Sequence, residues 1–166
     1  MKYNGPRYKK VNLPFQEDDK PRGGVVGVKF LEIVDGDTAH FLVYNEDVTV
    51  RFLAIDTPEL HPSAMPFAKE AKEFTNKILS HAKSIQLQSD VSDSLYDDTE
   101  SHRLLAWIWA DKKLLNYQLV EEGFATVRYV YSDKLLYLDD LYYAQKRAIA
   151  NKKGIHSIKN DERMSA

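Results

Sequence analysis

The chain has 166 residues, of which 43% are hydrophobic and 29% charged, as is typical of one globular domain with a buried core. It contains no cysteine, which excludes disulfides and thiolate chemistry. Its formal net charge of −2 does not favour a protein that coats nucleic acid with a basic surface. Contact with phosphate would therefore depend on local placement of charge.

The ends of the chain are expected to flank a single domain. Residues 1–24 hold three prolines, many charges and the pair Gly23-Gly24, which predicts a polar N-terminal tail or linker. They include no apolar segment of a signal peptide, although a chain whose signal was removed would look the same. No stretch reaches the ~18 apolar residues of a membrane span. We expect the domain over residues 25–157 and a C-terminal tail over 158–166.

Three strands in meander order are predicted first. The segments 25–34, 38–44 and 48–52 are rich in β-branched residues, and turn signals separate them. In the third strand apolar residues alternate with polar ones, which places Arg51 on the face opposite the core.

A helix is predicted to follow from Pro66, a residue that suits a first helical turn. Its expected apolar stripe recurs at helical spacing and consists of Phe67, Ala71, Phe74 and Ile78.

The rest of the domain is expected to add two strands and two helices. The predicted elements are a strand at 85–87, a polar loop over 89–102, a strand over 103–109 and a helix over 114–122 ended by Gly123. Five short, mostly antiparallel strands with helices around them predict an α+β fold that is mainly β, namely a five-stranded OB-fold barrel with three flanking α-helices.

The last helix has its own start and stop signals. Ser132 or Asp133 can cap its beginning, and Gly154 is expected to close it. Its expected apolar stripe consists of Leu138, Leu141, Tyr142, Ala148 and Ile149.

Two acidic clusters carry the candidate chemistry. The motif Asp35-Gly36-Asp37-Thr38 is by itself typical of a hairpin turn, but a carboxylate at a strand edge can also bind a hard cation. The motif from Arg51 to Glu59 is harder to explain as structure alone, because Pro58 sets a turn that lets Asp56 and Glu59 converge. Asp37, Asp56 and a backbone carbonyl would supply the oxygen ligands that Ca²⁺ prefers.

Three further kinds of residue could complete such a site. Glu59 beside a water could act as a general base, and Arg51 matches phosphate geometry bidentately. Arg103 begins a strand, where a lone arginine is more often an exposed surface residue. Tyr129 and Tyr131 are as typical of packing as of stacking on bases.

In order and spacing, these motifs resemble the staphylococcal nuclease family. The match runs from about Val25 to Ser157, and its motifs are Val34–Thr38, Arg51–Glu59, Arg103–Ala106, Leu119–Gly123 and Tyr129–Tyr131. The resemblance implies an OB-fold barrel with three helices. It also implies Ca²⁺-dependent hydrolysis of P–O5′ bonds in single-stranded DNA and RNA, with 3′-phosphate products.

The resemblance further implies roles for eight residues. It implies metal ligation by Asp37, Asp56 and the Thr57 carbonyl, orientation or deprotonation of the attacking water by Glu59, binding of the phosphate by Arg51 and Arg103, and contact with the nucleotide by Tyr129 and Tyr131. A secreted or cell-surface protein is implied if a signal was removed, and a cytoplasmic one is expected if the chain is complete as written. A monomer is the default expectation.

The sequence also departs from the family pattern. Thr99–His102 stands where Asp-Lys-Tyr-Gly is frequent, and His61–Met65 lacks the lysines often found there. Both changes are expected to weaken substrate binding more than chemistry. The alternatives are a non-catalytic module of the same fold that binds nucleic acid or protein, and a plain OB-fold single-strand binder, which the net charge disfavours. Because all five charged site residues are present, the nuclease is the leading hypothesis.

Overall fold

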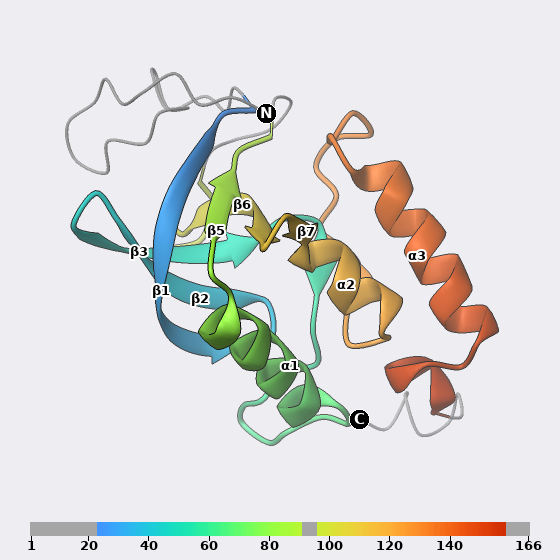
Figure 1. Ribbon diagram of the computed structural model, residues 1–166. Helices are drawn as coiled ribbons and strands as arrows, with labels where there is room; N and C mark the ends of the chain where they lie inside the picture. Colours follow the sequence, from blue (N-terminus) through green and yellow to red (C-terminus); the bar gives the residue numbers. More distant parts are fainter. Residues whose placement is uncertain (1–22, 91–95, 159–166) are drawn as a thin grey trace.

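A closed five-stranded barrel forms the centre of the computed structural model, which describes residues 23–90 and 96–158 (Figure 1). Neighbouring strands follow the order β3-β2-β1-β5-β6, and a parallel β3–β6 pairing closes the barrel. The strands are β1 (Val25–Asp35), β2 (Thr38–Val43), β3 (Glu46–Phe52), β5 (Ile85–Gln88) and β6 (Leu104–Ala110). The predicted α+β fold, a five-stranded barrel with three helices, is confirmed.

The first strand pairs with two neighbours, one along each part of its length. The first four residues of β1 pair with β5, and the remainder pairs with β2. The register shifts between Phe30 and Glu32 and again between Ile33 and Asp35. Such bulges bend a strand and increase its twist, which is what a tightly curved barrel requires. They also end β1 with Asp35 at the start of the turn that carries Asp37.

Alternating side chains fill the interior. In β3, Val48, Val50 and Phe52 are buried while Arg51 lies on the other face, as the sequence predicts. By contrast, β6 is buried along almost its whole length, because α2 (Leu115–Glu121) covers its outer side. Two short strand pairs extend the frame: β7 (Lys113–Leu114) pairs with β6, and β4 (Ile55–Asp56) pairs with β8 (Thr126–Val127).

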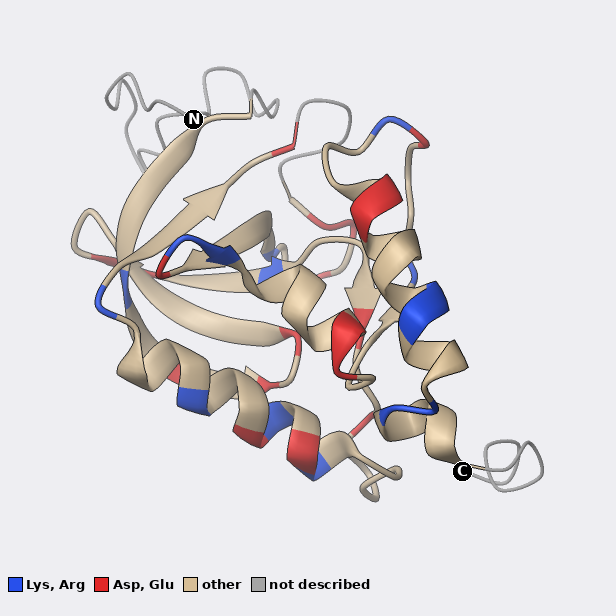
Figure 2. Ribbon diagram, turned by 45° about the vertical axis from the view of Figure 1, so that its right-hand side comes forward, with Lys and Arg blue, Asp and Glu red and all other residues tan. Residues whose placement is uncertain are grey.

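The first helix, α1 (Ala68–His81), lies below the barrel and carries charges of both signs on its outer side (Figures 1 and 2). The predicted apolar stripe is confirmed in part, because Ala71 is buried and both Phe74 and Ile78 pack against the core. Phe67 adopts a left-handed φ of 68° before the helix begins, and Phe74 and Ile78 are only half-buried. The small or compact residues Ala68, Ala71, Thr75 and Leu79 are buried instead, which lets the helix approach the β1–β2 turn closely.

The other two helices pack side by side on the opposite flank (Figure 1). As predicted, α2 ends just before Gly123, which has a left-handed φ of 75°. For α3 (Leu138–Ala150) the predicted cap at Ser132 or Asp133 is wrong, because the helix begins only at Leu138, after Tyr137.

The predicted stripe of α3 and its end at Gly154 also need correction. Tyr142 and Ile149 are 48% and 51% exposed, since the buried stripe runs through Leu138, Leu141, Ala144 and Ala148. Gly154 lies in a short 3₁₀ helix, η1 (Gly154–Ser157), beyond the end of α3. Its backbone packs against Gly123, where a Cβ atom would meet the Lys153 carbonyl.

The predicted tails fall almost entirely outside the described residues, at 1–22 and 159–166. At the described end of the first segment, the Gly23 N–H donates to the Ser89 hydroxyl and the Gly24 carbonyl accepts from the Ser89 N–H. Among the described residues, no helix has the length and apolar character needed to cross a bilayer.

Candidate active site

A cavity of about 280 Å³ opens at one end of the barrel, where the β1–β2 turn, β3 and β4 meet the segments before β6 and after β8. Every residue that the sequence predicted for the site lines it. These are Asp37, Arg51, Asp56, Thr57, Glu59, Arg103, Tyr129 and Tyr131. Residues up to 94 positions apart in the sequence are thus brought to one hollow by the closure of the barrel.

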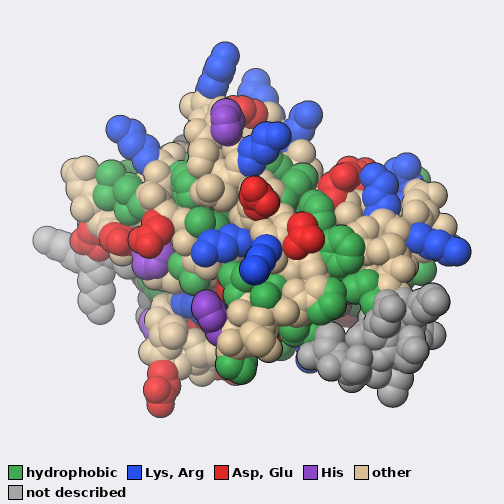
Figure 3. All heavy atoms as spheres, turned by 90° about the horizontal axis from the view of Figure 1, so that it is seen from below, with side chains coloured by type: hydrophobic (Ala, Val, Ile, Leu, Met, Phe, Trp, Pro, Cys, Tyr) green, Lys and Arg blue, Asp and Glu red, His purple; other side chains and the backbone are tan. Residues whose placement is uncertain are grey.

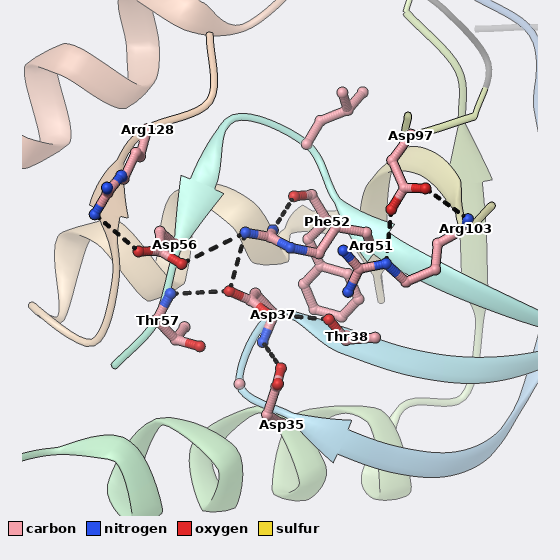
Figure 4. A network of polar contacts seen from close by, with 12 residues as sticks. Asp35, Asp37, Thr38, Arg51, Phe52, Asp56, Thr57, Asp97, Arg103 and Arg128 are labelled. Atoms are coloured by element: carbon pink, nitrogen blue, oxygen red, sulfur yellow. Dashed lines mark hydrogen bonds and ion pairs between the residues drawn. The ribbon is translucent and has the colours of Figure 1, made fainter. Parts of the chain in front are cut away.

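Asp37 is the most buried acid of the cavity, with 5% of the residue exposed. Its Oδ2 accepts a hydrogen bond from the Thr57 N–H at 2.9 Å and lies 3.3 Å from Nη2 of Arg51 (Figure 4). Its Oδ1 accepts from the Thr38 hydroxyl at 3.0 Å. Burial by itself would raise the pKa of Asp37, but the Arg51 charge and the hydrogen bonds outweigh burial and lower it. Asp37 is therefore a fixed negative charge.

Asp35 forms a carboxyl pair with Asp37. Its Oδ1 accepts from the Asp37 N–H at 3.2 Å. Burial, together with the hydrogen bond and negative charge of Asp37, raises the pKa of Asp35 to about 7. In the absence of a bound cation, this acid therefore keeps its proton to a higher pH than an ordinary carboxyl group does.

Arg51 links the two predicted metal-binding carboxylates. Its Nη2 lies 3.3 Å from Oδ2 of Asp37 and 3.6 Å from Oδ1 of Asp56, while its Nη1 donates to the Phe52 carbonyl at 2.7 Å. In Figure 4 both carboxylates point at the same guanidinium from different elements. Burial and the nearby charge of Asp37 raise the pKa of Asp56, and the arginines oppose that shift. The two acids thus face a shared position for positive charge.

Arg103 is held by a partner that the sequence did not reveal. Its Nε donates to Oδ2 of Asp97 at 2.7 Å, and its backbone N–H donates to Oδ1 at 2.9 Å. Oδ1 also accepts from the Thr99 hydroxyl at 2.9 Å. Burial would raise the pKa of Asp97, but these hydrogen bonds outweigh it and lower the pKa. Asp97 thereby fixes both the backbone and the side chain of Arg103.

The substituted segment before Arg103 keeps an unusual backbone. His102 stands where the family pattern has glycine, and it adopts a left-handed φ of 49°. Its ring stacks on Tyr96, with the centroids 4.4 Å apart. This contact accompanies a conformation that is uncommon for residues other than glycine.

The remaining predicted residues face solvent at the rim of the cavity. Glu59 is exposed, and its charge acts on the pKa of Asp56. Tyr129 and Tyr131 are 46% and 52% exposed. The guanidinium carbons of Arg51 and Arg128 lie 5.6 and 5.1 Å from the centre of the Tyr129 ring. Arg128, which the sequence did not single out, is therefore a third arginine at this site.

Within residues 23–90 and 96–158, no three acidic or histidine side chains are arranged to hold a metal ion. The oxygens that face one cationic position come from two carboxylates, Asp37 and Asp56. This donor set fits a hard cation such as Ca²⁺, which also accepts carbonyl oxygen and water as ligands. It does not fit a metal that requires sulfur or imidazole ligands.

An α+β barrel of the OB type, with arginines and carboxylates turned into one cavity, is the class that this fold and site define. A family model described as "Staphylococcal nuclease homologue" matches residues 49–157. The chain therefore belongs to the staphylococcal nuclease family, as its motifs predicted.

Three relatives illustrate how far the similarity extends. The chain is 30% identical over 151 residues to endonuclease YncB of Bacillus subtilis, covering 89% of this chain and 68% of that protein. It is 29% identical over 147 residues to a thermonuclease of Staphylococcus hyicus, covering 87% and 83%. It is 35% identical over 137 residues to the SPbeta prophage-derived endonuclease YokF of Bacillus subtilis, covering 80% of this chain but 45% of that protein.

Proposed function

We propose that this protein is a Ca²⁺-dependent nuclease that hydrolyses P–O5′ bonds in single-stranded DNA and RNA and leaves 3′-phosphate ends. The observation that supports it best is the convergence of Asp37 and Asp56 on Arg51 in a cavity that Glu59 and Arg103 also line. The names of its relatives, endonuclease and thermonuclease, agree with this reaction class.

Asp37, Asp56 and the Thr57 carbonyl would hold the cation. The hydrogen bond from the Thr57 N–H to Asp37 ties these ligands together, because one residue orients a carboxylate through its N–H and offers its carbonyl as well. When bound, Ca²⁺ would neutralise charge on the phosphate and position water near it.

Glu59 acts as the general base in this proposal. Its exposed carboxylate takes the proton of a water whose oxygen attacks phosphorus. The P–O5′ bond breaks, the leaving oxygen takes up a proton to become a 5′-hydroxyl, and the phosphate stays on the 3′ side. A positioned base typically contributes a factor of about 10²–10⁴ to the rate.

The two arginines carry the phosphate. Arg51 is restrained by the Phe52 carbonyl and Arg103 by Asp97, so both guanidinium groups are oriented before substrate arrives. Donors fixed in advance stabilise charge that develops in the transition state without further reorganisation. The exposed rings of Tyr129 and Tyr131 are placed to contact the nucleotide at the rim.

The test is cleavage of a 5′-labelled single-stranded DNA oligonucleotide and its RNA counterpart by the wild type and by Glu59→Gln. Each protein is assayed with Ca²⁺ and with a calcium chelator. We expect Ca²⁺-dependent cleavage to 3′-phosphate ends, reduced about 10²-fold or more in the variant. Glu70→Gln, an exposed acid in the first turn of α1, is the matched control and should cleave like the wild type.

Other outcomes would separate the alternatives. Binding of both oligonucleotides without cleavage by the folded wild type would favour a non-catalytic nucleic-acid-binding module. Cleavage that survives the chelator would remove Ca²⁺ from the proposal. Equal rates for Glu59→Gln and the wild type would remove Glu59 as the base.

A further inference from the structure

Arg128 occupies a position that the proposed reaction does not use. The pairing of Asp56 with Thr126, in β4 and β8, brings the segment after β8 beside the site, and the Arg128 N–H donates to the Ala54 carbonyl at 3.0 Å. Its Nη1 lies 3.6 Å from Oδ2 of Asp56, on the carboxylate that Arg51 approaches through Oδ1 (Figure 4). The two arginines therefore flank one carboxylate from opposite oxygens.

Its side chain remains accessible to an incoming anion. The side chain is 63% exposed, against 11% for Arg51. A separation of 3.6 Å from Asp56 is long for a hydrogen bond, and an exposed ion pair of this kind contributes little. The guanidinium carbon lies 5.1 Å from the centre of the Tyr129 ring, a cation–π contact that leaves the N–H donors of Arg128 available.

A second cavity, of about 320 Å³, begins where the first one ends. The two cavities share Asp56 and Thr57 as a common wall. The second has a mostly apolar lining that includes Met65, Pro66 and Ile155, and among its described lining residues Arg128 is the only basic one. An apolar floor with one guanidinium at its edge suits a nucleotide, because the faces of its base are apolar and its phosphate is anionic.

We propose that Arg128 and this second cavity form an additional nucleotide subsite, which takes the unit of the strand next to the cleaved phosphate. Arg128 binds the neighbouring phosphodiester, and the apolar floor receives the attached sugar and base. The inference deepens the proposed nuclease function and rests on it. It predicts that oligonucleotides bind better than mononucleotides, because only they reach Arg128.

The test measures binding separately from cleavage. Fluorescence anisotropy of a labelled single-stranded DNA octamer is followed in the Glu59→Gln background with Ca²⁺, across a salt series, with and without Arg128→Ala. Loss of Arg128 is expected to weaken octamer binding about 3–10-fold at low salt. The slope of log affinity against log salt should become shallower by about 0.7, the value for one phosphate contact on a single strand. The concentration of thymidine 5′-monophosphate that displaces half of the octamer should change less than about twofold on loss of Arg128.

Arg147→Ala is the matched control. This arginine on α3 also lies over a tyrosine ring, with its guanidinium carbon 5.7 Å from the centre of Tyr143, but it does not line either cavity. The control should leave octamer affinity and salt slope unchanged. Equal behaviour of the two variants, or an equal loss for octamer and mononucleotide in Arg128→Ala, would overturn the subsite.

Failure of the subsite and failure of the nuclease proposal are distinguishable. If the wild type cleaves and Arg128→Ala leaves the salt dependence of octamer binding unchanged, the subsite proposal is rejected and the nuclease proposal stands. If Arg128→Ala reduces the salt dependence of octamer binding but the wild type does not cleave, the subsite is retained as a binding site and the nuclease proposal is rejected. Absence of octamer binding at low salt would overturn the subsite whatever the cleavage result.

Discussion

Gly36 tests whether close packing beneath the site positions its ligands. An added Cβ atom would lie 2.8 Å from Thr57 Cγ2, 3.0 Å from Thr57 Cβ and 2.9 Å from the Ala71 Cβ. Neither neighbour can yield easily, because Thr57 is 4% exposed and Ala71 is fully buried in α1. Gly36→Ala must therefore displace either the helix or Thr57.

The expected cost follows from these contacts. Overpacking of a close-packed site costs about 1–3 kcal/mol, and replacing glycine returns about 0.4–1 kcal/mol through the unfolded chain. The net loss should be about 1–2 kcal/mol, which lowers Tm by about 2–8 °C for a chain of this size. Since Thr57 also orients Asp37 through its N–H, we expect kcat/KM to fall about 10–100-fold at temperatures where the variant is fully folded.

The assay compares thermal melting and oligonucleotide cleavage for two glycine variants. Gly27→Ala is the control, because a Cβ there meets nothing within 4 Å, and its Tm and activity should stay close to those of the wild type. Adding Thr57→Ser to Gly36→Ala removes Cγ2, the closest contact, and should restore part of both quantities.

Two results would refute this reasoning. Wild-type stability in Gly36→Ala would mean that the contacts around Gly36 are not tight. A stability loss without any loss of kcat/KM would mean that Thr57 does not position the site.

Two further predictions concern residues that support the site. Asn116→Ala should lower the free energy of unfolding by about 2–4 kcal/mol, measured by urea denaturation. The buried Asn116 side chain donates to the Leu53 carbonyl and accepts from the Ile108 N–H, each at 2.9 Å. A loss below about 1 kcal/mol would contradict this prediction. Asp97→Asn should be less stable than the wild type above pH 3.8, because the lowered pKa of Asp97 means that its carboxylate stabilises the folded state there. The stability difference should shrink as pH falls below 3.8 towards the folded-state pKa; a difference in unfolding free energy that is constant from pH 7 to pH 3 would contradict this assignment.

The parts of the fold that the sequence predicts are those with a local cause. Alternation in β3 is enough to place Arg51 off the core, and Gly123 is enough to end α2. The eight predicted site residues each lie in a short motif, and all of them line one cavity. These residues converge because the barrel closes through the parallel pairing of β3 with β6. That pairing cannot be predicted from a local sequence pattern.

The wrong predictions have tertiary causes. In α1 the large side chains Phe67 and Phe74 were expected to define the buried stripe. Both pack against Phe124 at the edge of the core, with ring centroids 6.5 and 5.2 Å apart, while Ala71 lies against Gly36 in the β1–β2 turn. In α3 an apolar residue such as Ile149 is expected in the core from its side chain alone. Which face of the helix is buried depends on how α3 packs against α2.

Asp97 and Arg128 show why a list of motifs underestimates the site. Each looks like an ordinary surface charge in the sequence, yet one fixes Arg103 and the other meets Asp56. All three arginines of the site are paired with carboxylates, and the face shown in Figure 3 mixes basic with acidic side chains instead of gathering one sign. With a net charge of −2, the molecule has no long-range attraction for a polyanion. Affinity for a strand must then depend on how many of these arginines it reaches at once, so the length of the substrate should govern binding more than its total charge.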